Sequence, residues 1–144
     1  MKINFPKINH IILKSIQYAV ITPIFKNIKL GANINISMHL ESADKLNKIL
    51  VAFAKINLQV VNTDNKDNSP LINLHMEYVI SMNNTSKATL NTLETKFSTF
   101  IFESVWPYFR HDVNDILTRS NYPAFIPFPM FNQSMMVNLQ KNKE

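Results

Sequence analysis

Most of the information about this fold lies in two adjoining stretches, FESVWPYFRHDVNDILTR at residues 102–119 and SNYPAFIPFPMFNQSMMVNL at residues 120–139. In the first stretch, apolar residues recur at spacings of four, three, four and three, the pattern of one face of an amphipathic helix. These residues are Phe102, Trp106, Phe109, Val113 and Ile116. Such a face has to pack against another apolar surface, and we expect it to belong to the core.

Pro107 lies inside this helical pattern. Proline lacks a backbone N–H and is best tolerated in the first turn of a helix. We therefore predict that a helix begins near Val105, with Pro107 in its first turn. The alternative is a longer helix that is kinked at Pro107.

The second stretch contains three closely spaced prolines, Pro123, Pro127 and Pro129. Prolines at this spacing exclude a regular helix and favour an extended path. After them, Asn132 is a suitable N-cap for a short last helix. The apolar residues of that helix are Met135, Met136 and Leu139.

The first half of the chain reads as four strands. Residues 32–41 alternate apolar and polar side chains throughout, residues 49–61 do so in their second half, and residues 72–80 do so over most of their length. The first strand, residues 8–21, is less regular, because Lys14 interrupts it. We place on one of its faces Ile12, Ile16, Tyr18 and Val20.

The turn-forming residues 63–70 predict a hairpin between the third and fourth strands. Strands over residues 8–82 and helices over residues 88–141 together predict a single α+β domain spanning residues 1–144. In this fold a four-stranded antiparallel sheet has its apolar face covered by the C-terminal helices.

Composition narrows the class of protein. At 144 residues with no cysteine, the chain is long enough for one core and fits a reducing compartment. No apolar run of about 18 residues exists to span a membrane. The start of the chain, residues 1–7, lacks the features of a signal peptide. We therefore expect a cytoplasmic protein.

The net charge of +5 raises the question of nucleic-acid binding. Arg110 and Arg119 are the only arginines, however, and the lysines are spread along the chain without a basic run. Arginine usually carries base and phosphate recognition, so we expect no nucleic-acid partner. With Gly31 as the single glycine, a phosphate-binding loop is excluded.

Four histidines, His10, His39, His75 and His111, are far apart in sequence. None has a second ligand at metal-binding spacing on one helix face. A metal bridging the polar sides of the strands that carry His39 and His75 is conceivable. Solvated strand histidines are the better interpretation, and we expect no metal.

Asp112 and Asp115 lie near Arg110 at helical spacing, which favours ion pairs on the surface. A paired-carboxylate acid–base site would require one buried member, which the pattern does not indicate. No serine or threonine has the context of a nucleophile. We therefore expect no enzyme and no cofactor.

Two irregular segments are unusually apolar for loops. The first contains Ile24, Phe25 and Ile28, and the second contains Tyr122, Phe125 and Phe128. Either these side chains fill a subunit interface, or they line a groove for apolar ligands. Both roles are compatible.

The C-terminal segment resembles that of SecB, the protein-export chaperone. The similarity is carried by residues 106–110, WPYFR, by Arg119 leading into Tyr122-Pro123, and by Asn138 in the short helix after Pro129. Ser120 stands where SecB has glycine, and Pro127 is an additional proline. Outside this segment the resemblance rests on strand order and on scattered matches such as residues 11–18.

The resemblance implies an ATP-independent holdase with a SecB-like fold, in which a long first connection crosses over to the second strand. Unfolded client polypeptides would bind in hydrophobic grooves between that connection and the C-terminal loop and helix. By position, the client-binding residues would be Ile24, Phe25, Ile28, Tyr122, Phe125, Phe128, Met135 and Met136.

The same resemblance implies a homotetramer, built as a dimer of dimers, with first strands and long helices at the interfaces. The residues placed near these contacts are Tyr18, Tyr108, Arg110, Asp112 and Asp115. Some SecB-like proteins guard a labile antitoxin in a toxin–antitoxin system, so the client is either a preprotein or an antitoxin.

One departure bears on the partner. SecB proteins that deliver preproteins to the motor SecA present acidic residues on the outer sheet face, whereas this chain has Ser15, Ala19 and Asn73 at the aligned positions. Docking to SecA by charge complementarity is therefore not expected. Two other hypotheses remain: a small-ligand or lipid-binding α+β domain with a closed apolar cavity, and a purely structural oligomer.

Overall fold

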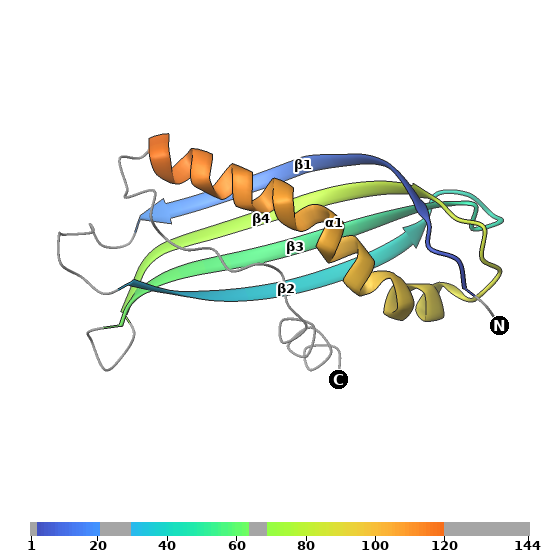
Figure 1. Cartoon of the computed structure of the whole chain (residues 1–144), viewed down its shortest axis with the longest axis horizontal. Coiled ribbons are helices and arrows are strands. Elements are labelled where there is room, and N and C mark those ends of the chain that lie inside the picture. The colour runs from blue at the N-terminus through green and yellow to red at the C-terminus, as the bar shows by residue number, and fades with distance from the viewer. Residues whose placement is uncertain (1–2, 21–29, 64–68, 120–144) are drawn as a thin grey trace.

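The computed structural model describes residues 3–20, 30–63 and 69–119. These residues form four strands and one helix (Figure 1). The elements are β1 (Lys7–Val20), β2 (Leu30–Ser42), β3 (Ile49–Asn62), β4 (Ser69–Asn83) and α1 (Leu90–Arg119). The predicted second helix lies outside the described residues.

All four strands are antiparallel to their neighbours, and their order in the sheet is β1-β4-β3-β2. Strands β1 and β2 are consecutive in the chain but lie at opposite edges of the sheet (Figure 1). The connection between them therefore crosses the width of the sheet. This arrangement confirms the predicted α+β fold with a long crossover connection.

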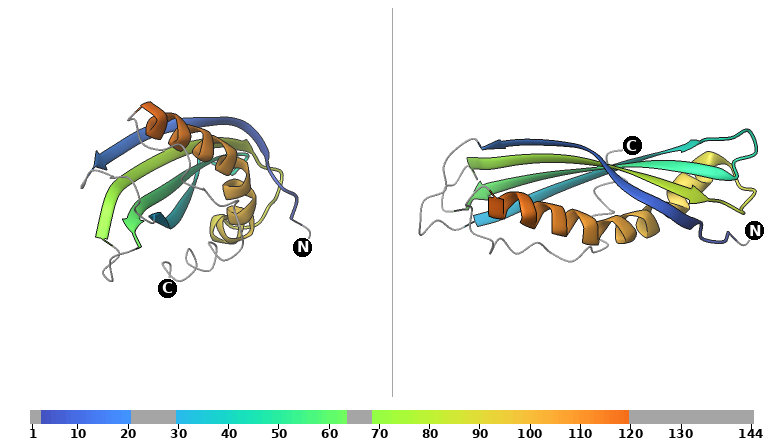
Figure 2. Two further views of the ribbon diagram at one scale, coloured as in Figure 1. Left: turned by 60° about the vertical axis from the view of Figure 1, so that its left-hand side comes forward. Right: turned by 90° about the horizontal axis from the view of Figure 1, so that it is seen from above.

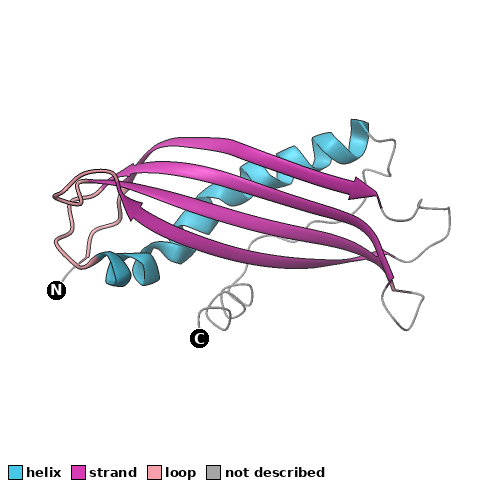
Figure 3. Cartoon of the chain, turned by 180° about the vertical axis from the view of Figure 1, so that it is seen from behind, coloured by secondary structure: helices cyan, strands magenta, loops and turns pink. Residues whose placement is uncertain are grey.

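Helix α1 runs diagonally across one face of the sheet, as the views from the front, the side and behind show (Figures 1, 2 and 3). The side chains that β2, β3 and β4 direct toward this helix are buried, while most of those on the opposite face are exposed or half-buried. The core includes Ile36, Met38, Leu40, Ile56, Leu58, Val60, Ile72, Leu74, Met76 and Ile80. The alternation of these three strands is therefore confirmed, except at the start of β2, where Ala32 is exposed.

The predicted faces of β1 need correction. The register of β1 against β4 shifts twice, between Ile8 and His10 and between Leu13 and Ser15. Each shift reverses which parity of residue faces the core. Ile12 therefore lies opposite Val79 on the outer face and is 59 % exposed, whereas Ile16 and Tyr18 lie on the helix side.

These irregularities have a physical reason. Residues 11–18 carry apolar side chains at spacings that no uninterrupted strand could place on one face. The irregularity around Lys14 lets both Leu13 and Tyr18 pack against the core. Lys14 itself points outward, where its ammonium nitrogen lies 3.5 Å from a carboxylate oxygen of Glu77 and 5.2 Å from the ring centroid of Phe53.

The predicted start of the helix at Val105 is wrong, because α1 is continuous from Leu90 to Arg119 with Pro107 inside it. An interior proline costs about 3 kcal/mol. Buried side chains on both sides of it, such as Phe102 and Phe109, each contribute roughly 1.5–3 kcal/mol of burial. The summed burial of one continuous apolar face outweighs the cost of the proline, whose ring faces solvent.

Helix α1 begins with a polar cap. The hydroxyl of Thr89 accepts a hydrogen bond from the backbone N–H of Thr92 at 3.4 Å, and its carbonyl accepts one from Leu93 at 3.0 Å. Unsatisfied N–H groups at a helix start are commonly capped in this way. The helix start is therefore encoded next to Leu90, well before the segment where the apolar stripe is clearest.

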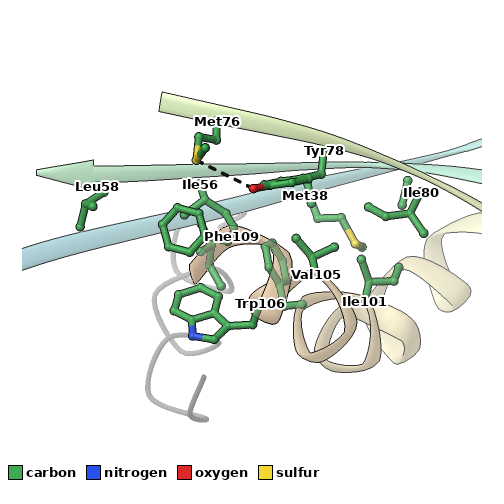
Figure 4. Close-up of a cluster of buried hydrophobic side chains, with 14 of the residues drawn as sticks. Met38, Ile56, Leu58, Met76, Tyr78, Ile80, Ile101, Val105, Trp106 and Phe109 are labelled. Carbon is green, nitrogen blue, oxygen red and sulfur yellow. Dashed lines mark hydrogen bonds between the residues drawn. The ribbon is translucent and has the colours of Figure 1, made fainter. Parts of the chain in front are cut away.

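The apolar stripe of α1 packs on the sheet as predicted. Phe102, Trp106, Phe109 and Val113 are buried, and Ile116 packs against the core while half-buried. Figure 4 shows Val105, Phe109 and Ile101 projecting from the helix toward the strands. The rings of Trp106 and Phe109 lie 5.0 Å apart at a tilted angle, a favourable aromatic arrangement.

Polar contacts also cross this interface, and the one between Tyr78 and Asp112 is buried on the tyrosine side. The buried Tyr78 of β4 donates its hydroxyl to Asp112 of α1 at 2.7 Å, and the same hydroxyl lies 3.9 Å from the sulfur of Met76 (Figure 4). Burial raises the pKa of Tyr78 above its ordinary range, and the hydrogen bond and negative charge of Asp112 raise it further. Tyr78 therefore stays protonated and holds one orientation of the helix on the sheet.

The first prediction concerns Pro107. Pro107→Ala restores a backbone donor for the carbonyl of Glu103 and should raise the free energy of unfolding by roughly 1–3 kcal/mol. Urea unfolding followed by circular dichroism measures this change, with Asn114→Ala as the control at another exposed position of α1. A loss of stability in Pro107→Ala would show that the helix depends on the proline.

The second prediction concerns Tyr78. Tyr78→Phe removes the donor to Asp112 and should lower the free energy of unfolding at pH 7 by about 1–3 kcal/mol. Because the folded-state pKa is raised, this contribution is complete below the unfolded-state pKa of about 10 and declines as pH rises above it.

The stability difference between wild type and Tyr78→Phe should therefore narrow above pH 10. Asn114→Ala, at an exposed position of α1, serves as the control and should show no such change with pH. A difference between wild type and Tyr78→Phe that stays constant from pH 7 to pH 11 would contradict the assignment.

Candidate functional site

All eight predicted client-binding residues lie outside the described residues, in segments 21–29 and 120–144. The structure does define where these segments attach. Antiparallel pairing places the end of β1 at Val20 and the start of β2 at Leu30 at the same end of the sheet. Helix α1 also ends at this end, at Arg119 (Figures 1 and 2).

Both apolar segments therefore start from one end of the molecule, which we call the crossover end. It consists of Val20, Leu30, Asn62, Ser69 and Arg119. The opposite end, which we call the hairpin end, contains the β2–β3 turn and the β4–α1 connection. In Figure 3 these loops gather beside the start of the chain.

Strand β1 is an edge strand with exposed apolar side chains on both faces. Ile12 is 59 % exposed on the outer face and Ile16 is 41 % exposed on the helix side. Tyr18, a predicted interface residue, is half-buried against the core. Its hydroxyl is buried and has no hydrogen-bond partner within the described part of the chain. A buried hydroxyl without a partner is costly and uncommon.

The other predicted interface residues lie on α1 in different environments. Tyr108 is 52 % exposed, Asp115 is exposed and Arg110 is half-buried. Asp112 does not fit the expected surface ion pair, because its carboxylate turns inward and accepts the hydrogen bond from Tyr78. Sequence spacing could not reveal this contact, since Tyr78 lies 34 positions away.

The outer face of the sheet is rich in uncharged carboxamides near the crossover end. A hollow of about 520 Å³ there is lined largely by Gln17, Asn33, Asn35, Asn57, Gln59, Asn73 and His75. Sequence analysis did not identify this site, although asparagines at alternate strand positions were its visible signal. Side chains of this kind donate and accept hydrogen bonds without charge.

The positions aligned with the acidic residues of SecB lie on this outer face. Ser15 lies opposite Glu77, and Ala19 lies opposite Asn73. The carboxylate of Glu77 is itself paired with Lys14. Lys55 is exposed and also lies opposite Glu77, so the outer face around these positions carries no net negative charge.

The two strand histidines do not meet. His39 lies opposite Phe53 and contacts Glu41 at 3.2 Å, whereas His75 lies opposite Asn57 and contacts its side-chain oxygen. Within residues 3–20, 30–63 and 69–119, no group of three histidine or carboxylate side chains is placed to hold a metal ion. No helix in these ranges is long and apolar enough to cross a membrane.

Comparison with known proteins places the fold. No family model and no curated protein matches the sequence. Among solved structures, the chain is similar to the SecB-like chaperone Rv1957 of Mycobacterium tuberculosis, determined in complex with a ChAD peptide from the Rv1956 HigA1 antitoxin. The TM-score is 0.70 at 19 % sequence identity, covering 87 % of this chain and 90 % of Rv1957. The chain therefore has the SecB-like α+β fold.

Proposed function

We propose that this protein is an ATP-independent chaperone of the SecB type, which holds unfolded polypeptides in apolar grooves. The observation that carries the proposal is the common origin of two apolar segments at the crossover end of a SecB-like fold. The structurally similar Rv1957 was solved with a bound peptide, which supports a polypeptide as the ligand.

The client-binding surface would be formed by Ile24, Phe25 and Ile28 of the first connection and by Tyr122, Phe125, Phe128, Met135 and Met136 of the C-terminal segment. Methionine side chains adapt to varied partners, and aromatic side chains supply large contact areas. Side chains of these two kinds suit a holdase, which has to bind clients of varied sequence.

The assembly we propose is a dimer of dimers, with β1 and α1 at the interfaces. Two features of β1 support its participation: the exposed Ile12 and Ile16, and the Tyr18 hydroxyl that no described residue satisfies. The exposed Tyr108 and Asp115 lie seven positions apart on α1, so they share one face of the helix. We assign that face to a contact between subunits.

The client is either a preprotein or a labile antitoxin. The outer face has no net negative charge around Ser15 and Ala19, which disfavours charge-based docking to SecA and favours a role outside general export. The solved complex of Rv1957 with an antitoxin peptide points to the same class of client. We place this activity in the cytoplasm.

A small-ligand or lipid-binding domain with a closed cavity is the second hypothesis. Against it, the layer between α1 and the sheet is filled by the continuous core cluster, which includes Leu93, Phe97 and Phe102 from the helix. A lipid would need that space. The packing in the described part of the chain thus favours binding at the surface.

The third prediction tests the client groove. Substituting Phe25→Asp together with Phe128→Asp should weaken binding of a fluorescein-labelled unfolded client at least about tenfold, because charged groups replace apolar contacts. Fluorescence anisotropy measures the affinity, and thermal unfolding checks that the fold is retained.

The matched control for this experiment is Asn91→Asp with Asn114→Asp, which adds the same charge at exposed positions of α1. It should bind the client as wild type does. If the variant with Phe25→Asp and Phe128→Asp folds and binds the client with unchanged affinity, the two segments do not form the groove.

A further inference from the structure

A second hollow, more apolar than the first, lies at the hairpin end of the sheet, opposite the crossover end. It has a volume of about 790 Å³ and sits between the β2–β3 turn and the connection from β4 to α1. These two loops lie side by side in the view from behind (Figure 3). The volume falls within the range of typical ligand-binding sites.

The hollow is built on a fixed frame. The buried Asn84 donates its side-chain amide to the carbonyls of Asn47 at 2.8 Å and Ser86 at 3.1 Å, and its oxygen accepts from the N–H of Ser86. Its backbone N–H also bonds the carbonyl of Lys48 at 2.7 Å. Asn84 thus ties the two loops together, so little ordering entropy would be lost on binding.

The lining combines apolar side chains with a small positive charge. Leu46 is 72 % exposed and Ile49 is 43 % exposed, so both present apolar surface to the hollow that they line. Lys48 and Lys87 also line the hollow, as does one carboxylate, that of Asp44. Two cations and one anion leave a net charge of +1.

The Asp44 carboxylate is already engaged. One of its oxygens accepts hydrogen bonds from the backbone N–H groups of Lys48 at 2.8 Å and Ile49 at 3.3 Å. That oxygen is therefore directed into the turn. The ammonium groups of the two lysines remain to attract a negatively charged ligand.

The distance between the two ends limits which ligand could use both. Strand β3 has 14 residues, and strands rise about 3.3 Å per residue, so the ends lie roughly 45 Å apart. An extended polypeptide of about 14 residues spans the same length. A shorter client could occupy one end of the sheet only.

We propose that the hollow at the hairpin end is a second contact point for the same client. This inference rests on the proposed function. The segment bound here would carry an apolar side chain, which enters between Leu46 and Ile49, next to an acidic side chain, which faces Lys48 and Lys87. Because both contacts belong to one chain, the second binding step is intramolecular, and clients are selected by length.

The fourth prediction compares two labelled unstructured peptides. The short peptide has about 10 residues and carries an apolar segment for the crossover end. The long peptide has about 30 residues and adds a distal apolar–acidic motif. The lengths follow from the strand rise given above. Wild type should bind the long peptide at least about tenfold more tightly, since the tethered motif binds at high effective concentration.

Leu46→Ser with Ile49→Ser should abolish this gain and leave affinity for the short peptide unchanged. The matched control is Lys45→Ser, an exposed position in the same turn that does not line the hollow. Lys48→Gln with Lys87→Gln should reduce the gain several-fold, and replacing the acidic residue of the motif by lysine should do the same.

The outcomes separate the two proposals. The second contact point would be overturned if wild type bound the two peptides with equal affinity. It would also be overturned if the variant with Leu46→Ser and Ile49→Ser preferred the long peptide as strongly as wild type does. Binding of neither peptide to wild type would instead overturn the proposed chaperone function. Thermal unfolding of the variants should stay close to wild type, because all four substituted side chains reach the surface.

Discussion

The structure depends on one contact, the packing of α1 on the apolar face of the sheet. In strands β2, β3 and β4, buried apolar side chains recur at alternate positions, so most of them lie on one face of the sheet. That side has to be removed from water, and a single 30-residue helix supplies the complementary face. The continuity of α1 through Pro107 follows from the same requirement.

Much of this fold could be predicted from the sequence. The alternation in residues 32–41, in the second half of residues 49–61 and in residues 72–80 predicted the correct faces, because a half-buried strand has a period of two. The stripe around Phe102 and Phe109 gave the correct inner face of the helix, because helical spacing survives an internal proline. Both patterns depend on residues that are near one another in the chain.

The errors share a different cause. Ile12 was assigned to the wrong face because the register shift near Lys14 depends on how β1 pairs with β4, a long-range contact. Asp112 was expected on the surface because its partner Tyr78 belongs to a distant strand. The hollow at the hairpin end is likewise assembled from two loops about 40 positions apart in the chain. Local spacing carries no signal for such pairings.

The proposed function uses the same geometry. The crossover connection puts one apolar segment at the end of the sheet where α1 also stops, so that two stretches far apart in sequence begin together. The opposite end carries exposed Leu46 and Ile49 on a frame held by Asn84. The sheet and its helix would then act as a rigid spacer between surfaces that contact a flexible client.

Amide hydrogen exchange, measured on the assembled protein with and without an unfolded client, tests the central claim most directly. If both segments hold the client, we expect the client to slow exchange in residues 21–29 and 120–144 and to leave exchange in α1 and β2–β4 unchanged. Strong protection of both segments in the free protein, with no further change on adding client, would contradict the claim.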